Sequence, residues 1–286
     1  MLSRTTTPKL VIFTDLDGAL LDRETYYFEP AQPALHLVRE KKIPLIFVSS
    51  KTRAEIEGYR RRMENKYPFV SENGGAIFVP KKTFSFSFSY ERELGGYFVL
   101  ELGTFYPQIL RALELIKKET GVRIRAFHEL SEKELASLSG LSHEEAALAR
   151  KREYDEPFVI EGGTGEIETI RRKIKERGLN YVWGGRFHHI LGKNDKGKAV
   201  EILKGLYKKE FHEVVTVGVG DSLNDLPMLD VVDHPIFLKG KEGLSPDVVS
   251  RVRNLVLMEG TGPQAWNDAI LNLLHGQETQ SLKKGK

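Results

Sequence analysis

Two short apolar segments that lie far apart in the chain each end at an aspartate, and they constrain the fold more than any other feature. Residues 9–14 read KLVIFT and precede Asp15, and residues 214–220 read VVTVGVG and precede Asp221. Short runs of β-branched and other apolar residues are typical of strands that are buried on both faces of a parallel sheet. Open sheets of this kind bind ligands at the carboxyl ends of their strands. If both segments belong to one sheet, Asp15 and Asp221 converge on one crevice.

The order of the other patterns indicates that one domain interrupts another. Residues 43–48 form a further buried strand after a helix over residues 31–42, which gives a βαβ unit. Residues 83–90 read TFSFSFSY and alternate with period two, which predicts a half-exposed antiparallel strand. We expect the phenylalanines of this segment to pack under the sheet of the inserted domain. The parallel-sheet pattern returns at Lys196.

We therefore predict an α/β fold in which a Rossmann-like parallel-sheet core carries an inserted α+β domain. The predicted boundaries are residues 1–82 and 191–276 for the core, 83–190 for the insertion and 277–286 for a disordered polar tail.

The composition excludes several kinds of site. The 286 residues include no cysteine, which rules out disulfides, zinc–thiolate sites, iron–sulfur clusters and cysteine nucleophiles. The 43 basic and 40 acidic residues leave a net charge of +3, which is no argument for a nucleic-acid partner. No apolar run approaches the ~20 residues that span a bilayer, and residues 1–8 lack the apolar stretch of a signal peptide. We expect a cytoplasmic protein that binds neither membranes nor nucleic acids, and the sequence gives no indication of its oligomeric state.

Asp15 and Asp17 are candidate metal ligands. Two carboxylates at positions i and i+2 of an extended strand point to the same side, and they repel each other unless a cation holds them. Carboxylate oxygens suit a hard divalent metal such as Mg²⁺. A plain Asp-Gly turn is the alternative, but Asp221 at a second strand end weighs against it. The pattern thus predicts that Asp15, Asp17 and Asp221 supply three carboxylates to one metal ion.

Ser49 and Lys196 are candidate phosphate-binding residues. Ser49 ends the second strand, where its hydroxyl could donate to a phosphate oxygen; the alternative is a helix N-cap, for which Ser50 is an equal candidate. Lys196 begins a predicted helix, where a cation opposes the helix dipole unless an anion lies nearby. A surface lysine is the alternative.

These residues together resemble the four motifs of the haloacid dehalogenase superfamily. The motifs are Asp15-Leu16-Asp17-Gly18, Ser49, Lys196 and Gly220-Asp221-Ser222-Leu223-Asn224-Asp225. The resemblance spans the whole core and implies a Mg²⁺-dependent hydrolase whose inserted domain is an α+β (type 2) cap. One departure is Ala19, where the superfamily usually has threonine.

The resemblance also implies the roles of the acidic residues. Asp15 would be the nucleophile that forms an aspartyl-phosphate. Asp17 would protonate the leaving alkoxide and then deprotonate the water that hydrolyses the intermediate. Asp15, the main-chain carbonyl of Asp17 and Asp221 would hold Mg²⁺.

The other motif residues would support this chemistry. Ser49 and Lys196 would bind the phosphoryl oxygens and offset their charge in the transition state. Asn224 and Asp225 would orient Lys196 or metal-bound water.

Four further segments resemble the mannosyl-3-phosphoglycerate phosphatase family within that superfamily. They are Ser49-Ser50-Lys51-Thr52, Ser71-Glu72-Asn73-Gly74-Gly75, Arg152-Glu153-Tyr154-Asp155-Glu156-Pro157-Phe158 and Gly184-Gly185-Arg186-Phe187. The resemblance implies hydrolysis of 2-O-mannosyl-3-phosphoglycerate to mannosylglycerate, a compatible solute. The alternatives are a phosphatase acting on glucosyl-3-phosphoglycerate or sucrose phosphate, a phosphomannomutase, and a catalytically silent binding protein.

The same segments supply candidates for contact with the substrate. Arg152 and Arg186 are the best candidates for a glycerate carboxylate, because a guanidinium can bind it bidentately. Glu72 and Asn73 lie in a loop beside the crevice and could meet sugar hydroxyls. The full predicted substrate-binding set is Ser50, Glu72, Asn73, Arg152, Gly185 and Arg186.

His188 and His189 receive a structural interpretation. They are adjacent in an alternating strand, so their side chains face opposite ways and do not easily share a metal.

Overall fold

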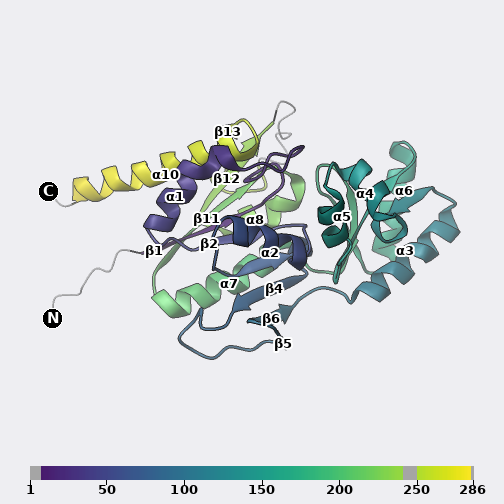
Figure 1. The fold of residues 1–286 in the computed structure, drawn as a ribbon, viewed down its shortest axis with the longest axis horizontal. Coiled ribbons are helices and arrows are strands. Elements are labelled where there is room, and N and C mark those ends of the chain that lie inside the picture. The colour runs from purple at the N-terminus through teal and green to yellow at the C-terminus, as the bar shows by residue number, and fades with distance from the viewer. Residues whose placement is uncertain (1–7, 241–249, 285–286) are drawn as a thin grey trace.

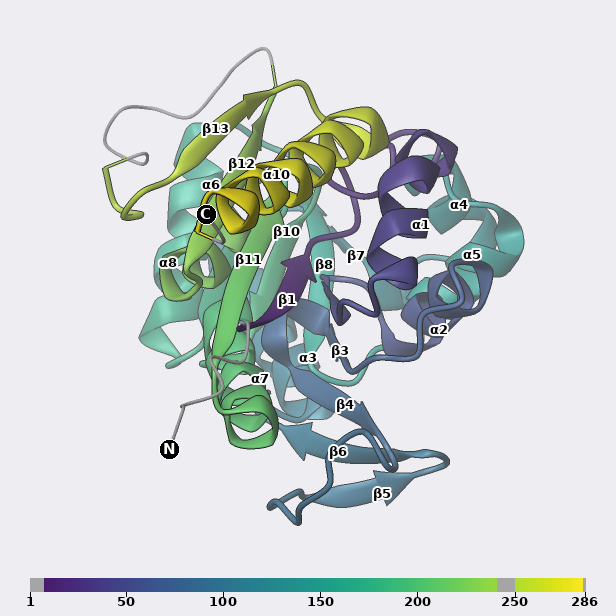
Figure 2. The same cartoon turned by 90° about the vertical axis from the view of Figure 1, so that its left-hand side faces the viewer.

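The larger of two sheets is built from both ends of the chain. The computed structural model describes the backbone of residues 8–240 and 250–284, and the side chains of residues 8–240 and 250–276. Within that part, the larger sheet has nine strands in the order β13-β12-β11-β1-β2-β3-β4-β6-β5. β1 (Lys9–Thr14) lies between β11 (Val214–Gly220) and β2 (Leu45–Val48), and both neighbours run parallel to it (Figure 2). The predicted α/β core is therefore confirmed.

The remaining strands extend this sheet on both sides. They are β3 (Phe69–Ser71), β4 (Ala76–Pro80), β5 (Arg92–Leu94), β6 (Tyr97–Glu101), β12 (His234–Lys239) and β13 (Val256–Glu259). The strands from β13 to β3 are parallel, whereas β4, β5 and β6 pair antiparallel at one edge.

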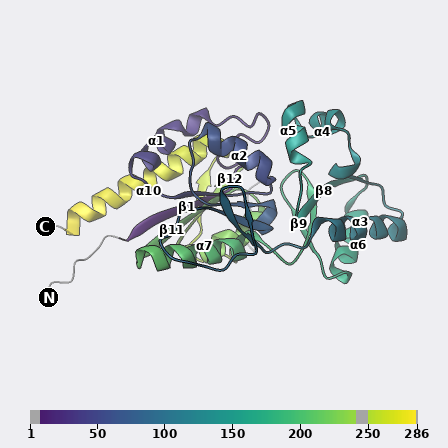
Figure 3. The same ribbon diagram turned by 60° about the horizontal axis from the view of Figure 1, so that its bottom comes forward.

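Helices cover both faces of the large sheet, as Figures 1 and 3 show. One face carries α1 (Gln32–Glu40), α2 (Arg53–Arg62) and α10 (Gly262–Lys284), and the other carries α7 (Lys196–Phe211) and α8 (Leu226–Val231). The four central residues of β1, Leu10 to Phe13, are all apolar because alternate residues enter different clusters, one beneath each layer of helices.

A buried tryptophan fixes α10 against the strand that leads to Asp15. Trp266 is fully buried, and its Nε1–H donates to Thr14 Oγ1 at 2.9 Å. The contact ties the last helix to the carboxyl end of β1, so the C-terminal segment helps to position the candidate nucleophile.

Residues 106–191 form a second domain, which we call the cap. Its four strands pair antiparallel in the order β7-β8-β10-β9. Its elements are α3 (Tyr106–Thr120), β7 (Ile124–Ala126), α4 (Glu132–Ser139), α5 (His143–Ala149), β8 (Asp155–Ile160), α6 (Thr164–Glu176), β9 (Asn180–Trp183) and β10 (His188–Leu191). α3 and α6 bury an apolar cluster against one face of the sheet, and the cap stands beside the core at one end of the molecule (Figure 1).

The segment 83–90 does not form the predicted strand, and it does not belong to the cap. Phe84 packs edge-on against Tyr207 of α7 at 5.2 Å between ring centroids, and Phe88 packs against Phe98 of β6 at 5.7 Å. The alternating aromatic residues cover the core without making strand hydrogen bonds. Because β5 and β6 also pair in the core sheet, the insertion begins after β6 and not at residue 83.

The predicted disordered tail, residues 277–286, is also corrected. α10 continues to Lys284, and residues 285–286 lie outside the described part. Ile270 and Leu274 are buried against the core and anchor the preceding turns of α10. Adding residues to a helix that is already formed costs little free energy, because the unfavourable step is nucleation. Neither α10 nor any other helix in the described ranges is both long and apolar enough to cross a membrane.

Candidate active site

Three buried carboxylates converge at the carboxyl ends of β1 and β11. Asp15 follows β1, and its N–H donates to Val219 O at 2.9 Å, which extends the pairing of these strands by one residue. Asp221 follows β11, and Asp225 ends the 3₁₀ turn η4 (Leu223–Asp225). One carboxylate oxygen from each of the three aspartates lies within 4.8 Å of the other two. The structure thus brings Asp15 and Asp221 together as the sequence predicts.

Lys196 lies between two of these carboxylates. It is the first residue of α7, and its Nζ donates to Asp15 Oδ1 at 2.7 Å and to Asp225 Oδ1 at 2.6 Å. Its side chain is only 1% exposed. Burial alone would lower the pKa of Lys196, but the two carboxylates outweigh burial and raise this pKa. The lysine is therefore a buried cation that neutralises acidic groups, which rules out the alternative of a surface lysine.

The acidic cluster holds more negative charge than its protein neighbours balance. Burial, followed by the nearby Asp225 carboxylate, raises the pKa of Asp15 well above its usual range. The same two causes raise the pKa of Asp221 to about 7. Desolvated carboxylates that repel one another in this way favour an additional cation.

The site fits a hard divalent cation. Asp221 Oδ1 is buried and has no hydrogen-bond partner among the described residues. Gly18, at φ +85°, lies so close to Asp221 Oδ2 that a Cβ would overlap it, so the turn after Asp15 can pack against this carboxylate only because residue 18 is glycine. An all-oxygen donor set of carboxylates is the set that Mg²⁺ or Ca²⁺ prefers.

The Asp17 carboxylate does not join this cluster. Its Oδ1 lies 3.0 Å from Nζ of Lys51, and the third converging carboxylate is that of Asp225. The i, i+2 argument fails because β1 ends at Thr14 and the chain turns immediately afterwards. The three side-chain carboxylates that converge are therefore those of Asp15, Asp221 and Asp225, and the predicted Asp17 carboxylate is not among them.

Ser49 and Ser50 differ in their surroundings. Ser49 is fully buried at the end of β2, and its Oγ accepts from Lys51 N at 3.2 Å. Neither serine caps α2, because Thr52 occupies the N-cap and accepts from Glu55 N. Ser50 lines the cavity described below, where it can reach a ligand.

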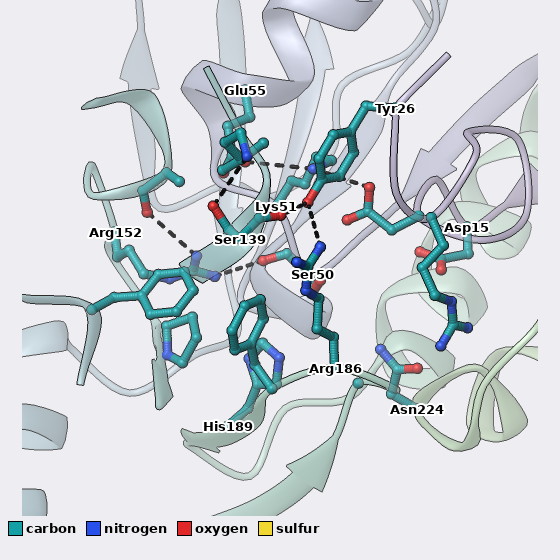
Figure 4. Close-up of a pocket in the computed structure, with 18 residues that line it drawn as sticks. Asp15, Tyr26, Ser50, Lys51, Glu55, Ser139, Arg152, Arg186, His189 and Asn224 are labelled. Carbon is teal, nitrogen blue, oxygen red and sulfur yellow. Dashed lines mark hydrogen bonds and ion pairs between the residues drawn. The ribbon is translucent and has the colours of Figure 1, made fainter. Parts of the chain in front are cut away.

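A cavity between core and cap opens onto Asp15 and Asp17 (Figure 4). Its empty space, including the part open to solvent, is about 690 Å³. The carboxylates of Asp15, Asp17 and Glu55 line it, and cationic side chains enter it from both domains. They are Arg23 and Lys51 from the core and Arg152 and Arg186 from the cap.

Arg23 connects the acidic cluster with the cap. One of its guanidinium nitrogens pairs with Asp221 Oδ2, and Nη1 donates to Gly185 O at 3.3 Å. Gly185 has φ +80°, which a residue with a side chain adopts only with strain. Gly185 therefore contributes its main-chain carbonyl to the contact between Arg23 and the cap.

Arg186 is the more available of the two predicted carboxylate-binding arginines. Its long hydrogen bonds go to Tyr26 Oη at 3.4 Å and Leu138 O at 3.2 Å. Arg152 is 3% exposed in its side chain and donates to Asp155 O at 2.7 Å and to Ser50 O at 2.6 Å. Arg152 therefore joins cap to core, with its remaining N–H groups at the cavity wall.

Glu72 does not face the cavity. Its carboxylate accepts from the backbone N–H groups of Glu153, at 3.0 Å, and Tyr154, at 2.8 Å, where the chain enters β8. It also lies 3.7 Å from Arg152 Nε. Burial raises the pKa of Glu72 to about 8 although Arg152 acts in the opposite direction. The predicted contact of Glu72 with sugar hydroxyls is replaced by a role at the junction of core and cap.

Asn73 joins the loop of the acidic cluster to the cap. Its Oδ1 accepts from Asn224 Nδ2 at 3.0 Å, and its Nδ2 donates to Asp155 Oδ2 at 2.6 Å. Asn224 lines the cavity, whereas Asp225 positions Lys196 and accepts from the backbone N–H of Asp221 at 2.9 Å. Of the two predicted supporting residues, Asp225 is thus the one that orients the lysine.

Lys51 and Arg23 are the functional candidates that the sequence reasoning missed. Lys51 is buried, pairs with Asp17, and lies over the ring of Tyr26 at 4.5 Å. A signal existed for Lys51, because it follows the predicted phosphate-binding serine at the end of a strand. No sequence pattern marked Arg23, which reaches Asp221 only through the folding of the turn after Gly18.

Comparison with known proteins agrees with this geometry. The family model of haloacid dehalogenase-like hydrolases matches residues 12–241. The chain is 47% identical over 267 residues to the glucosyl-3-phosphoglycerate/mannosyl-3-phosphoglycerate phosphatase of Methanococcoides burtonii, a match that covers 93% of this chain and 97% of that protein. It is 38% identical to the mannosyl-3-phosphoglycerate phosphatase of Pyrococcus horikoshii, over 78% of this chain and 88% of that protein.

Solved structures show the same fold at much lower sequence identity. Thermoplasma acidophilum 0175 aligns with a TM-score of 0.65 at 17% identity, covering 93% of this chain and 98% of that one. The HAD subclass IIB sugar phosphatase BT4131 aligns with a TM-score of 0.63 at 16% identity, covering 94% and 99%. The resemblance found in the sequence motifs is thereby confirmed. The chain belongs to the haloacid dehalogenase-like hydrolases and, within them, to the family of the mannosyl-3-phosphoglycerate phosphatases.

Proposed function

We propose that this chain hydrolyses 2-O-mannosyl-3-phosphoglycerate to mannosylglycerate and phosphate, with Mg²⁺ as its cofactor. The observation that carries the proposal is the buried Lys196, which holds Asp15 beside Asp221 and Asp225 at the floor of a cavity rich in cationic side chains. The names of the relatives from Methanococcoides burtonii and Pyrococcus horikoshii support the choice of substrate.

Asp15 is the proposed nucleophile. Lys196 donates to its Oδ1, which leaves Oδ2 to attack phosphorus, so that a bond to Asp15 forms as the bond to the glycerate oxygen breaks. Asp17 gives its proton to the departing alkoxide and then takes one from the water that cleaves the aspartyl-phosphate. Lys51, 3.0 Å from Asp17 Oδ1, fixes the position of that side chain.

The bound metal would offset the charge of the phosphoryl oxygens during this transfer. Asp15, Asp221 and the main-chain carbonyl of Asp17 would hold it, and Asp225 would keep Lys196 in place. Ser49 and Lys196 would donate to the phosphoryl group.

The charge of the cavity matches the rest of the substrate. A phosphoglycerate carries a carboxylate close to its phosphate, so it needs more than one cationic partner. Arg186 enters the cavity from the cap, and its hydrogen bonds at 3.2 and 3.4 Å are weak enough to be exchanged for a carboxylate. The exclusion of water by the cap would strengthen these interactions.

A screen for phosphate release tests the proposal. The purified chain is assayed with mannosyl-3-phosphoglycerate, glucosyl-3-phosphoglycerate and sucrose phosphate, first with Mg²⁺ and then with a chelator. We expect the highest kcat/KM with the mannosyl ester, loss of activity on chelation, and loss in Asp15→Asn. Conversion of mannose-1-phosphate to mannose-6-phosphate with little free phosphate would identify a mutase instead.

Glucosyl-3-phosphoglycerate is the second candidate substrate. The relative from Methanococcoides burtonii bears both sugars in its name. The two esters differ only in the sugar, so equal kcat/KM values in the screen would establish dual specificity.

A further inference from the structure

A chain of hydrogen bonds runs from the loop of the acidic cluster into the cap. Asn224 Nδ2 donates to Asn73 Oδ1 at 3.0 Å, and Asn73 Nδ2 donates to Asp155 Oδ2 at 2.6 Å. Asp155 Oδ1 and Oδ2 lie 2.9 and 3.0 Å from His189 Nδ1. All four side chains are buried, so each of these bonds is shielded from water.

The direction of these hydrogen bonds determines which ring nitrogen of His189 carries a proton. Burial would raise the pKa of Asp155, but His189 and Arg152 outweigh burial and lower it, so Asp155 is ionised. A carboxylate only accepts hydrogen bonds, and therefore Nδ1 of His189 carries the proton that is donated to Asp155. The ring nitrogen left for another partner is Nε2.

Nε2 is accessible to a ligand in the cavity. His189 is 4% exposed and lines the cavity together with Asp15 and Arg186 (Figure 4). A Cβ on Gly184 would lie 2.9 Å from Nε2, so the glycine leaves the approach to this nitrogen open. Nε2 has no hydrogen-bond partner within the described ranges.

We propose that His189 binds a hydroxyl of the sugar part of the substrate through Nε2, and that Asp155 is a positioning residue that fixes the ring. A hydroxyl can both donate and accept, so it pairs with Nε2 in either protonation state, whereas a carboxylate pairs only with the charged ring. Arg186 already offers a cation to the anionic part of the substrate. The inference rests on the proposed function, because it assigns a place to the sugar.

The inference predicts a selective loss of recognition. His189→Phe keeps an aromatic ring and removes Nε2. The measured quantity is kcat/KM for the glycosyl-3-phosphoglycerate that the screen identifies, divided by kcat/KM for 3-phosphoglycerate, which lacks the sugar. We expect this ratio to fall by about ten- to a hundredfold, as for a lost buried hydrogen bond. An unchanged ratio in His189→Phe would overturn the inference.

His188→Phe is the matched control. His188 is the neighbouring histidine on the opposite face of β10, where its ring stacks on Phe158 and its Nδ1 meets Tyr181 Oη at 2.6 Å. This variant loses a hydrogen bond in the cap but none toward the cavity. We expect its ratio to equal that of the wild type, and a fall as large as that in His189→Phe would show a general effect of cap stability and contradict the assignment.

The role of Asp155 is tested by exchanging partners along the chain of bonds. In Asp155→Asn, one amide N–H either faces the donor Asn73 Nδ2 or makes His189 Nδ1 an acceptor by moving the ring proton to Nε2. The ring loses the carboxylate that fixes its tautomer and orientation, so the ratio should fall. In the double variant Asp155→Asn with Asn73→Asp, every donor again meets an acceptor, including Asn224 Nδ2. We expect the double variant to recover a large part of the ratio, and no recovery would contradict a positioning role.

A spectroscopic measurement on the unaltered protein makes the test independent of how the variants fold. The imidazole ¹⁵N signals are recorded while the dephosphorylated glycosylglycerate is titrated into the Mg²⁺-loaded protein, with His188→Phe to assign the pair. We expect the Nε2 signal of His189 to shift, and saturation without a shift would refute the contact. Failure of the proposed function would be recognised separately, because the protein would then hydrolyse none of the glycosyl-3-phosphoglycerates in the screen.

Discussion

Replacing Lys196 by methionine removes the cation that holds the acidic cluster together and changes the side-chain length little. Its Nζ lies 2.7 Å from Asp15 Oδ1 and 2.6 Å from Asp225 Oδ1, and the side chain is 1% exposed. Removing one partner of a buried ion pair costs about 3–5 kcal/mol, because the other charge stays buried and unpaired. The pKa of Asp15 is already raised by burial, so Asp15 can take up a proton in the variant. We therefore expect the lower end, a loss of about 3 kcal/mol at neutral pH in the presence of a chelator.

The pH dependence of this loss has a defined sign. The neighbouring carboxylates raise the folded-state pKa of Lys196 above its ordinary value of 10.5 although burial opposes them. The protonated lysine therefore makes its full contribution to stability below the unfolded-state pKa of lysine, and this contribution is lost only as the pH rises through the folded-state pKa. Around neutral pH, titration of the lysine itself should therefore not change the difference in unfolding free energy between the wild type and Lys196→Met.

The assay follows urea unfolding of the core through the fluorescence of Trp266, in a background in which Trp183 is replaced by phenylalanine. Lys204→Met is the control on the same helix, because Lys204 pairs with Asp233 at a partly exposed position and should cost about 1 kcal/mol or less. Saturating Mg²⁺ should restore much of the stability of Lys196→Met, since a ligand that binds only the folded state stabilises it. A Lys196→Met protein within 1 kcal/mol of the wild type in chelator would refute the account of the cluster.

Other variants probe the junction, the cap turn and the last helix. Because burial raises the folded-state pKa of Glu72 from 4.5 to about 8, this residue should make wild-type stability fall as pH rises through that interval, by up to about 1.4 kcal/mol per unit. Glu72→Gln should lack this part of the fall and show a shallower slope; unfolding at pH 5, 7 and 9 measures the two slopes, and parallel slopes would contradict the assignment. Gly185→Ala should lower the free energy of unfolding by about 1–2 kcal/mol through strain at φ +80°. The added Cβ, 2.5 Å from Arg23 Nη1, should also displace the contact between Arg23 and the cap and raise KM. Thermal unfolding and steady-state kinetics test both effects, and wild-type values would count against this contact. Trp266→Phe loses the hydrogen bond to Thr14 Oγ1 and part of a buried ring, so the free energy of unfolding measured by calorimetry should fall by about 1–3 kcal/mol. An unchanged melting temperature would argue against the anchoring of α10.

The core of the fold could be predicted because its strands are buried on both faces. β1 and β11 are made mostly of apolar residues, and the aspartates that follow them mark the ligand-binding edge. The convergence of Asp15 and Asp221 followed from topology alone, since parallel strands end at the same edge of a sheet. The helix of Lys196 brings that residue to the same edge, where its charge finds an acidic partner.

Other contacts depend on the path of the chain through turns, which periodicity does not encode. The Asp17 side chain leaves the cluster because the strand geometry ends at Thr14, and Asp225 replaces it from a 3₁₀ turn. Arg23 reaches Asp221 only because the turn after Gly18 folds back. These positions are set by local backbone angles and not by the spacing of residue types.

The domain boundary was wrong for a similar reason. The alternation of residues 83–90 has the period of a strand, but Phe84 and Phe88 use it to cover the core beside β6 and α7. Glu72 was likewise read as a possible sugar-binding residue, although its carboxylate is taken up by backbone N–H groups at the entry to β8. In both cases tertiary contacts overrode an interpretation based on local pattern.

The account as a whole depends on one divalent ion held between residues from the two ends of the chain. Titration of Mg²⁺ into the chelator-treated protein, followed by calorimetry, measures this directly. We predict one ion per chain for the wild type, loss of binding in Asp15→Asn and in Asp221→Asn, and retained binding in Asp17→Asn, whose carboxylate faces Lys51. Unchanged Mg²⁺ affinity in Asp221→Asn would contradict the account.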